Sequence, residues 1–196
     1  MIHLGFRTQK ASIFNAQGDN MEPKIMLVKP SMTYKEQIWN YKQDFHQRGE
    51  SLAGCGSLER TNSVEEWLND VKNYQSEQTC PKGHVPSTLF LAILKHDQKL
   101  IGMIDLRHHI NHPILNVWVG HIGYSVLYEE RRKGYAKEML KLVLDECRNL
   151  GLKKVLITCD VDNIGSRKVI LANGGIFEKN VDVDQSMKER YWITLA

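Results

Sequence analysis

The pattern of apolar and polar residues is clearest in the second half of the chain. From Gly134 onward apolar side chains recur at helical spacing, and Gly151 ends the pattern as a helix cap. This stripe consists of Ala136, Met139, Leu140, Val143, Leu144, Cys147 and Leu150. The apolar run at 155–157 is typical of a strand buried on both faces of a sheet. With the strand-like segment before the helix, this order predicts two parallel strands joined by a right-handed crossover.

The rest of the chain also alternates between helical and strand-like patterns. Ser63 and Glu66 have the spacing of a capping box and predict the start of a helix, and another helix is expected from Ser31 or Thr33 to Gln47. A further helix is expected at 163–173, and strands are expected at 24–29, 87–94, 100–106, within 116–127, near 176–181 and at 190–195. We therefore predict one α/β domain over residues 23–196. Residues 1–22 are polar and irregular, and we expect a mobile N-terminal extension there.

Composition excludes several classes of protein. The chain has 196 residues, of which 42% are hydrophobic and 25% charged, as in an ordinary globular protein. A net charge of +3 is too small to indicate nucleic acid, and no apolar stretch is long enough to predict a membrane span. The four scattered cysteines and the absence of a signal-peptide pattern predict reduced thiols and a cytoplasmic location. His108, His109 and His112 fit no metal-binding spacing, so no metal is expected.

The most informative charges stand where the predicted helix begins. Arg131, Arg132 and Lys133 are consecutive cations at a helix end that already carries partial positive charge, so an anion should compensate them. One source is the neighbouring pair Glu129-Glu130, and the other is a bound phosphate. Small residues at positions 134 and 136 favour the phosphate, because they let a backbone approach an oxyanion closely. The sequence lacks the patterns of a P-loop and of a dinucleotide fold.

These residues resemble the acyl-CoA loop of the GCN5-related N-acetyltransferases, the GNAT family. The loop motif reads Arg131-x-x-Gly134-x-Ala136 and follows the strand-like segment 121–126. The resemblance continues through the next helix and strand to Asn163-x-x-Ser166 and Gly174, and covers roughly residues 115–180. It implies the GNAT fold, in which helices flank a mixed central sheet with two splayed parallel strands.

The resemblance also implies a site for acetyl-CoA, as a co-substrate. Backbone N–H groups of residues 132–137 would hold the diphosphate, and Arg131, Arg132 and Lys133 would add charge. The backbone at 124–126 would pair with the pantetheine arm, and Asn163 and Ser166 would lie beside it. Asn163 suits a plain helix N-cap equally well. The implied cofactor-binding residues are Tyr124, Ser125, Val126, Arg131, Arg132, Lys133, Gly134, Tyr135, Ala136, Lys137, Asn163 and Ser166.

The groups that move protons are less clear from the sequence. Many members of the family carry a Tyr seven residues after the Asn, where it protonates the departing thiolate, but this chain has Ile170. Tyr135, Tyr191 and Cys159 are alternative acids. As the general base we expect first His121, then Asp105 and Asp160. His121 also fits a purely structural role in its strand.

We therefore expect an N-acetyltransferase that transfers the acetyl group of acetyl-CoA to a primary amine by direct attack. A non-catalytic acyl-CoA binding or sensing module is the alternative, and nucleic-acid binding by the basic helix start is a third, weaker hypothesis. The acceptor is expected to be a small-molecule or peptide amine, without nucleic acid or membrane as a partner, and the family allows for a homodimer. By fold analogy, the loops at 49–62 and 76–86 are expected to shape the acceptor side.

Overall fold

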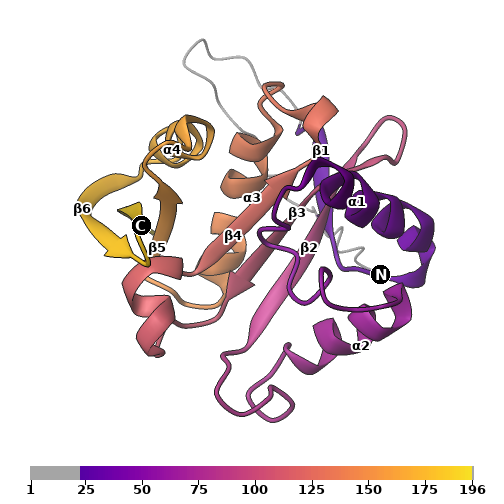
Figure 1. The fold of residues 1–196 in the computed structure, drawn as a ribbon, viewed down its shortest axis with the longest axis horizontal. Helices are drawn as coiled ribbons and strands as arrows, with labels where there is room; N and C mark the ends of the chain where they lie inside the picture. The colour runs from indigo at the N-terminus through magenta and orange to yellow at the C-terminus, as the bar shows by residue number, and fades with distance from the viewer. Residues whose placement is uncertain (1–22, 196) are drawn as a thin grey trace, which may run out of the picture.

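Two antiparallel sheets and four α-helices make up residues 23–195, the part of the chain that the computed structural model describes (Figure 1). The predicted N-terminal extension, 1–22, lies outside the described residues. The α/β class expected from the sequence is confirmed, because helices pack on both faces of the larger sheet.

The larger sheet has the strand order β1-β2-β3-β4. These strands are β1 (Ile25–Val28), β2 (Ser87–Leu94), β3 (Leu100–Arg107) and β4 (Ile122–Val126). Strand side chains alternate between the two faces of a sheet, so each face has its own core. Phe90 and Ile104 pack in the core that includes α3 (Tyr135–Asn149). Leu91 and Met103 pack in the core with α1 (Lys35–Arg48) and α2 (Val64–Asn73).

The smaller sheet has the order β5-β7-β6 and lies, with α4, on the opposite side of the molecule from α1 and α2 (Figure 1). Its elements are β5 (Lys154–Asp160), α4 (Ile164–Leu171), β6 (Ile176–Val183) and β7 (Ser186–Thr194). β5 is buried along residues 155–157, as its apolar run predicts. β6 forms one edge, where Ile176 and Phe177 are exposed.

In the described residues the backbones of the two sheets meet at one point, just before β4 begins, although their side chains share a core. Gly120 bridges Ile157, and the N–H of His121 donates to the Leu156 carbonyl at 2.8 Å. In return, the N–H of Leu156 donates to His121 Nδ1 at 2.9 Å. Beyond this point no ladder joins β4 to β5 in the described residues, and all ladders within the two sheets are antiparallel. The two strands that were expected to be parallel and splayed, β4 and β5, are therefore separated beyond this point and do not pair along their length.

Local signals fix several helix ends. Ser63 Oγ accepts from the Glu66 N–H at 3.1 Å, and the Glu66 carboxylate accepts from the Asn62 N–H at 2.8 Å, so the predicted cap is confirmed. The first helix begins later than expected, because a 3-10 turn at Met32–Tyr34 precedes it. The segment expected to contain strand from residue 116 instead forms a π-helix at Leu115–Val119, and the strand starts only at Ile122.

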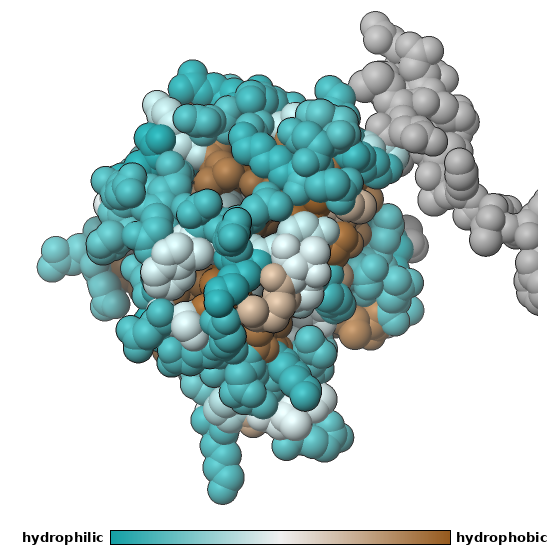
Figure 2. All heavy atoms as spheres, turned by 90° about the vertical axis from the view of Figure 1, so that its right-hand side faces the viewer, coloured by the Kyte–Doolittle hydropathy of each residue, from teal (hydrophilic) through white to brown (hydrophobic). Residues whose placement is uncertain are grey.

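Helices α1 and α2 form the side of the molecule that faces the viewer in Figure 2. This surface is mainly hydrophilic, and apolar side chains show between the polar ones. Among the described residues, no helix is both long and apolar enough to cross a membrane.

Candidate active site

The loop that leads into α3 has an unusual backbone. Arg132 has φ +61° and Gly134, the N-cap of α3, has φ +88°, so two residues flanking Lys133 adopt left-handed conformations. A Cβ built on Gly134 meets nothing within 4 Å, so the conformation, and not space, requires glycine there. Within residues 23–195 the N–H groups of 132–134 have no hydrogen-bond partner. Left-handed turns with free N–H groups at a helix start form a concave site for an anion.

Two of the three loop cations are already paired. The guanidinium of Arg131 contacts both carboxylate oxygens of Glu50, and its Nε donates to the Val126 carbonyl at 3.0 Å. The hydrogen bond from Arg131 lowers the pKa of Glu50. Lys133 pairs with Glu130 at 2.9 Å but remains half exposed. The interpretation that carboxylates neutralise the turn is thus partly right, and Glu50 is a partner that sequence reasoning missed.

Strand β4 presents one backbone edge to the gap between the sheets. The N–H of Leu127 donates to the Ile101 carbonyl at 2.9 Å, which fixes the phase of pairing with β3. Along a strand of an antiparallel pair, the backbone N–H and C=O groups of successive residues point alternately toward the partner strand and away from it. The N–H and C=O groups of Tyr124 and Val126 therefore point away from β3, toward the gap. The backbone of Ser125 faces β3, and its hydroxyl donates to the Ala53 carbonyl at 2.6 Å. Of the three residues implied at 124–126, the first and third therefore face the gap.

A hydrogen-bonded pair of hydroxyl groups connects β4 to α4 across this gap. Tyr124 Oη and Ser166 Oγ lie 2.8 Å apart, which joins β4 to the first turn of α4. Burial raises the pKa of Tyr124 to about 12, so its phenol stays protonated at neutral pH. Asn163 Oδ1 accepts from the Ser166 N–H at 3.0 Å, so Asn163 is an N-cap of α4, as its residue type favours.

Position 170, where many family members have a Tyr, lies in the core. Ile170 is 0% exposed and packs among the side chains under α3. A Cβ on Gly175 would lie 2.4 Å from Ile170 Cγ2, so this glycine makes room for the isoleucine. On α4 a hydroxyl group is instead provided by Ser166, which pairs with Tyr124 of β4. Sequence spacing alone gave no sign of this pair.

The contacts of His121 support its structural interpretation. The residue is 5% exposed, its Nδ1 already accepts the Leu156 N–H, and its ring packs edge-on against Trp192. Burial lowers the pKa of His121 to about 4, which makes the imidazole a weak base. His121 thus joins the two sheets.

The other residues considered as general acid or base differ in their partners and in their burial. Asp160 pairs with Lys188, which lowers the pKa of its carboxyl group. Tyr191 donates to Glu189 at 2.8 Å, and burial raises the pKa of Cys159 to about 11. Tyr135 is half-buried against the core under α3.

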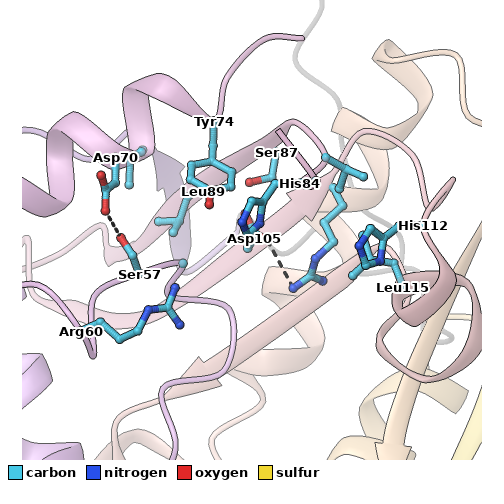
Figure 3. A pocket seen from close by; sticks show the side chains of 15 residues that line it. Ser57, Arg60, Asp70, Tyr74, His84, Ser87, Leu89, Asp105, His112 and Leu115 are labelled. Carbon is cyan, nitrogen blue, oxygen red and sulfur yellow. Dashed lines mark hydrogen bonds and ion pairs between the residues drawn. The ribbon is translucent and has the colours of Figure 1, made fainter. Parts of the chain in front are cut away.

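Asp105 lies in a pocket on the other face of β4. The pocket has a volume of about 240 Å³ and lies between α2, the two loops expected on the acceptor side and the ends of β2 and β3 (Figure 3). Asp105 is 5% exposed, pairs in register with Gly123 of β4, and lies 3.7 Å from Arg107. Burial raises the pKa of its carboxyl group. The pocket thus places a carboxyl group one strand away from the gap.

Among the described residues, no group of three or more His, Cys, Asp and Glu side chains is arranged to hold a metal ion.

Comparison with known proteins agrees with this geometry. The family described as acetyltransferase (GNAT) domain matches residues 35–176. None of the curated proteins matches the chain. Among solved structures, RimL, a ribosomal L7/L12 α-N-protein acetyltransferase in complex with coenzyme A, has a TM-score of 0.64 at 16% identity and covers 89% of this chain and 96% of its own.

Two further structures have the same fold. RimJ of Mycobacterium smegmatis, in complex with CoA-disulfide, has a TM-score of 0.63 at 18% identity and covers 87% of this chain and 81% of its own. The microcin C7 self-immunity acetyltransferase MccE, in complex with acetyl-CoA and AMP, has a TM-score of 0.57 at 17% identity and covers 92% of this chain and 98% of its own.

The fold and the family match together define an acetyltransferase. The chain belongs to the GNAT acetyltransferases, which use acetyl-CoA as the acyl donor.

Proposed function

We propose that the chain transfers the acetyl group of acetyl-CoA to a primary amine, which attacks the thioester directly. The observation that carries this proposal is the start of α3. There, left-handed conformations at Arg132 and Gly134 accompany N–H groups that have no partner among the described residues. A diphosphate satisfies such groups and gains from the partial positive charge of the helix start.

The residues present fit coenzyme A. Backbone N–H groups from Arg132 to Lys137 would bind the diphosphate, with charge from the side chains of Arg132 and Lys133. Since Arg131 is held by Glu50, its role is to fix the loop. The edge of β4 at Tyr124 and Val126 would pair with the pantetheine arm, and Asn163 and Ser166 would lie beside it. Acetyl-CoA would supply the acyl group as a thioester, and the Val126 N–H would stabilise negative charge that develops on its carbonyl oxygen.

The attacking amine must lose a proton, and Asp105 is the group best placed to take it. It is buried beside β4, in a pocket open to an acceptor, and its raised pKa brings the carboxylate closer to a useful base. His121 is engaged with Leu156, and Asp160 is engaged with Lys188. Asp105 lies 3.7 Å from Arg107, beyond hydrogen-bond distance, so these contacts favour it over the two other candidates.

The departing thiolate must gain a proton, and we assign this step to the hydroxyl pair of Tyr124 and Ser166. The pair lies between β4 and α4, and the phenol remains protonated at neutral pH. A thiol has a pKa of about 8.5, so the thiolate is a tolerable leaving group and the acid assists without being essential. The buried Ile170 cannot serve, because it has no ionisable group.

Calorimetry with acetyl-CoA, followed by a thiol-release assay with a series of primary amines, tests the proposal. We expect acetyl-CoA binding and amine-dependent release of the thiol. Binding without release for any amine would instead support the acyl-CoA sensing module, an alternative favoured by the isoleucine at position 170. No binding at all would contradict both functions.

A further inference from the structure

The charged groups at the two ends of the pocket next to Asp105 have different partners. Its end at β3 contains Asp105 and Arg107, which lie 3.7 Å apart. Its end at α2 contains Asp70, Ser57 and Arg60 (Figure 3). Each end thus carries one carboxyl group and one guanidinium. The two ends are not equivalent, however, because these charges have different partners.

At the β3 end, the two charged groups face each other without a hydrogen bond between them. Asp105 faces Arg107, and Arg107 Nη1 also donates to the Gly120 carbonyl at 3.3 Å. This end adjoins β4, since Asp105 pairs in register with Gly123. An acceptor amine must approach the thioester from the side of β4, so its nitrogen belongs at this end.

At the α2 end, the carboxyl group is satisfied and the guanidinium is not. Asp70 accepts a hydrogen bond from the Ser57 hydroxyl at 2.6 Å. Within residues 23–195, Arg60 makes no side-chain hydrogen bond or ion pair, although it lines the pocket. Arg60 is an exposed residue, and its guanidinium has five N–H groups to offer to an acceptor. An arginine in this setting matches a carboxylate or a phosphate.

We propose that the acceptor is a small amine that also carries an anionic group, a carboxylate or a phosphate. Its amine lies at Asp105, and its anionic group is bound by Arg60. This inference rests on the proposed acetyl transfer and names the substrate class of the same site. The pocket volume of about 240 Å³ is below the range of roughly 300–1,000 Å³ typical of drug-sized ligands, so a compact molecule fits.

The charges also argue against a purely cationic acceptor. A diamine would bring a second positive charge to the α2 end, where the guanidinium of Arg60 repels it and Asp70, whose carboxylate accepts from Ser57 but keeps its charge, offsets that repulsion without exceeding it. A neutral amide at that end would leave the guanidinium hydrated and gain little. The structure therefore predicts discrimination by the group remote from the amine.

A matched set of amines tests this discrimination with acetyl-CoA and a thiol-release assay. The set is 4-aminobutyrate, 3-aminopropylphosphonate, 4-aminobutyramide and 1,4-diaminobutane, each also used with longer and shorter chains. We expect kcat/KM for the two anionic compounds to exceed that for the amide and the diamine by about tenfold or more, the value of one charged hydrogen bond. Equal or better use of the amide or the diamine would overturn the inference.

Variants of Arg60 separate its role from general effects. Arg60→Gln should raise the KM for the anionic amines by about tenfold while leaving the amide unchanged, and Arg60→Lys should restore part of the loss. Arg148→Gln is the control, because Arg148 is an exposed arginine paired with Asp145 on α3, away from the pocket. Equal losses for all four amines in Arg60→Gln would contradict a contact with the anionic group.

Calorimetry with acetyl-CoA distinguishes this inference from the proposed function. If acetyl-CoA binds and none of the matched amines is acetylated at any chain length, the acceptor class is wrong while the donor site stands. If acetyl-CoA does not bind, the proposed function fails, and the inference that rests on it fails as well.

Discussion

His121 and Leu156 exchange two hydrogen bonds at the place where the backbones of the two sheets meet in the described residues. The backbone N–H of each residue donates to the other, to the Leu156 carbonyl in one direction and to His121 Nδ1 in the other. Because Nδ1 must be unprotonated to accept, this joint requires a neutral imidazole. The histidine therefore couples the attachment of the two sheets to pH.

This coupling predicts a loss of stability in acid. The pKa of His121 is lowered to about 4 in the folded protein, against about 6.5 in an unfolded chain, so the unfolded state binds the proton more tightly. Stability is then complete above pH 6.5 and falls as the pH drops toward 4, by about 3 kcal/mol in total from this residue. Chemical denaturation between pH 7 and pH 4 measures the loss.

His121→Asn is the informative variant for that measurement. An asparagine oxygen can replace Nδ1 as the acceptor, so the variant should lose the pH dependence from this site and keep most of its stability at pH 7. His121→Leu leaves the Leu156 N–H unpaired and should cost about 1–3 kcal/mol at pH 7. An unchanged difference between wild type and His121→Asn from pH 7 to pH 4 would contradict the assignment.

Two glycines at opposite ends of α3 provide a matched test of the acetyl-CoA site. Gly134 and Gly151 have φ +88° and +77°, and a Cβ on either meets nothing within 4 Å. Glutamate at either position should therefore cost similar stability, about 1–2 kcal/mol. Gly134→Glu also places a carboxylate where the diphosphate binds, so it should abolish acetyl-CoA binding in calorimetry, whereas Gly151→Glu should bind like wild type. Unchanged affinity in Gly134→Glu would refute the placement of the diphosphate.

Removal of the proposed base should change the pH profile. Asp105→Asn should lower kcat/KM by about 10²–10⁴-fold while acetyl-CoA affinity stays the same. The carboxylate is the active form, so wild-type activity should rise with pH through a pKa above the usual range of an aspartate, since burial raises it. Asp105→Asn should lose that rise, and Asp160→Asn should keep it. A profile unaltered by Asp105→Asn would exclude this residue as the base.

Removal of the hydroxyl pair should slow the chemical step without weakening binding. Tyr124→Phe and Ser166→Ala should each lower kcat by roughly ten- to hundredfold, less than a typical loss of acid catalysis because a thiolate leaves readily. Because the two hydroxyl groups are hydrogen-bonded, the double variant should be little worse than either single one. Tyr191→Phe, which removes a buried hydroxyl bonded to Glu189, serves as the control in the same steady-state assay. Full activity in Tyr124→Phe would contradict the role.

Much of the fold could be predicted because its signals are local. The stripe that begins after Gly134 forms α3, and the Ser63–Glu66 cap begins α2, since both depend on residues within a few positions. The segment from residue 116 was harder to assign, because its apolar residues suit a strand as well as the π-helix that forms at Leu115–Val119. Tertiary contacts decide between these conformations.

In the candidate site, too, the features set by neighbouring residues could be predicted from the sequence, and those set by distant residues could not. The acyl-CoA loop lies in one short stretch, and its conformation follows from Gly134. The ion pair of Arg131 with Glu50 joins residues 81 positions apart, and Tyr124 meets Ser166 across 42 positions. No pattern along the chain marks such partners. The arrangement of charged groups in the pocket, too, becomes visible only when the loop with Arg60 is placed beside the strand with Asp105.

The single joint at His121 has a consequence for how this scaffold can vary. Beyond this joint no ladder links β4 to β5 in the described residues, so a change in the separation of these strands breaks no ladder hydrogen bond. A substitution that changes this separation would thus alter the room for the acyl group while both ladders stay intact.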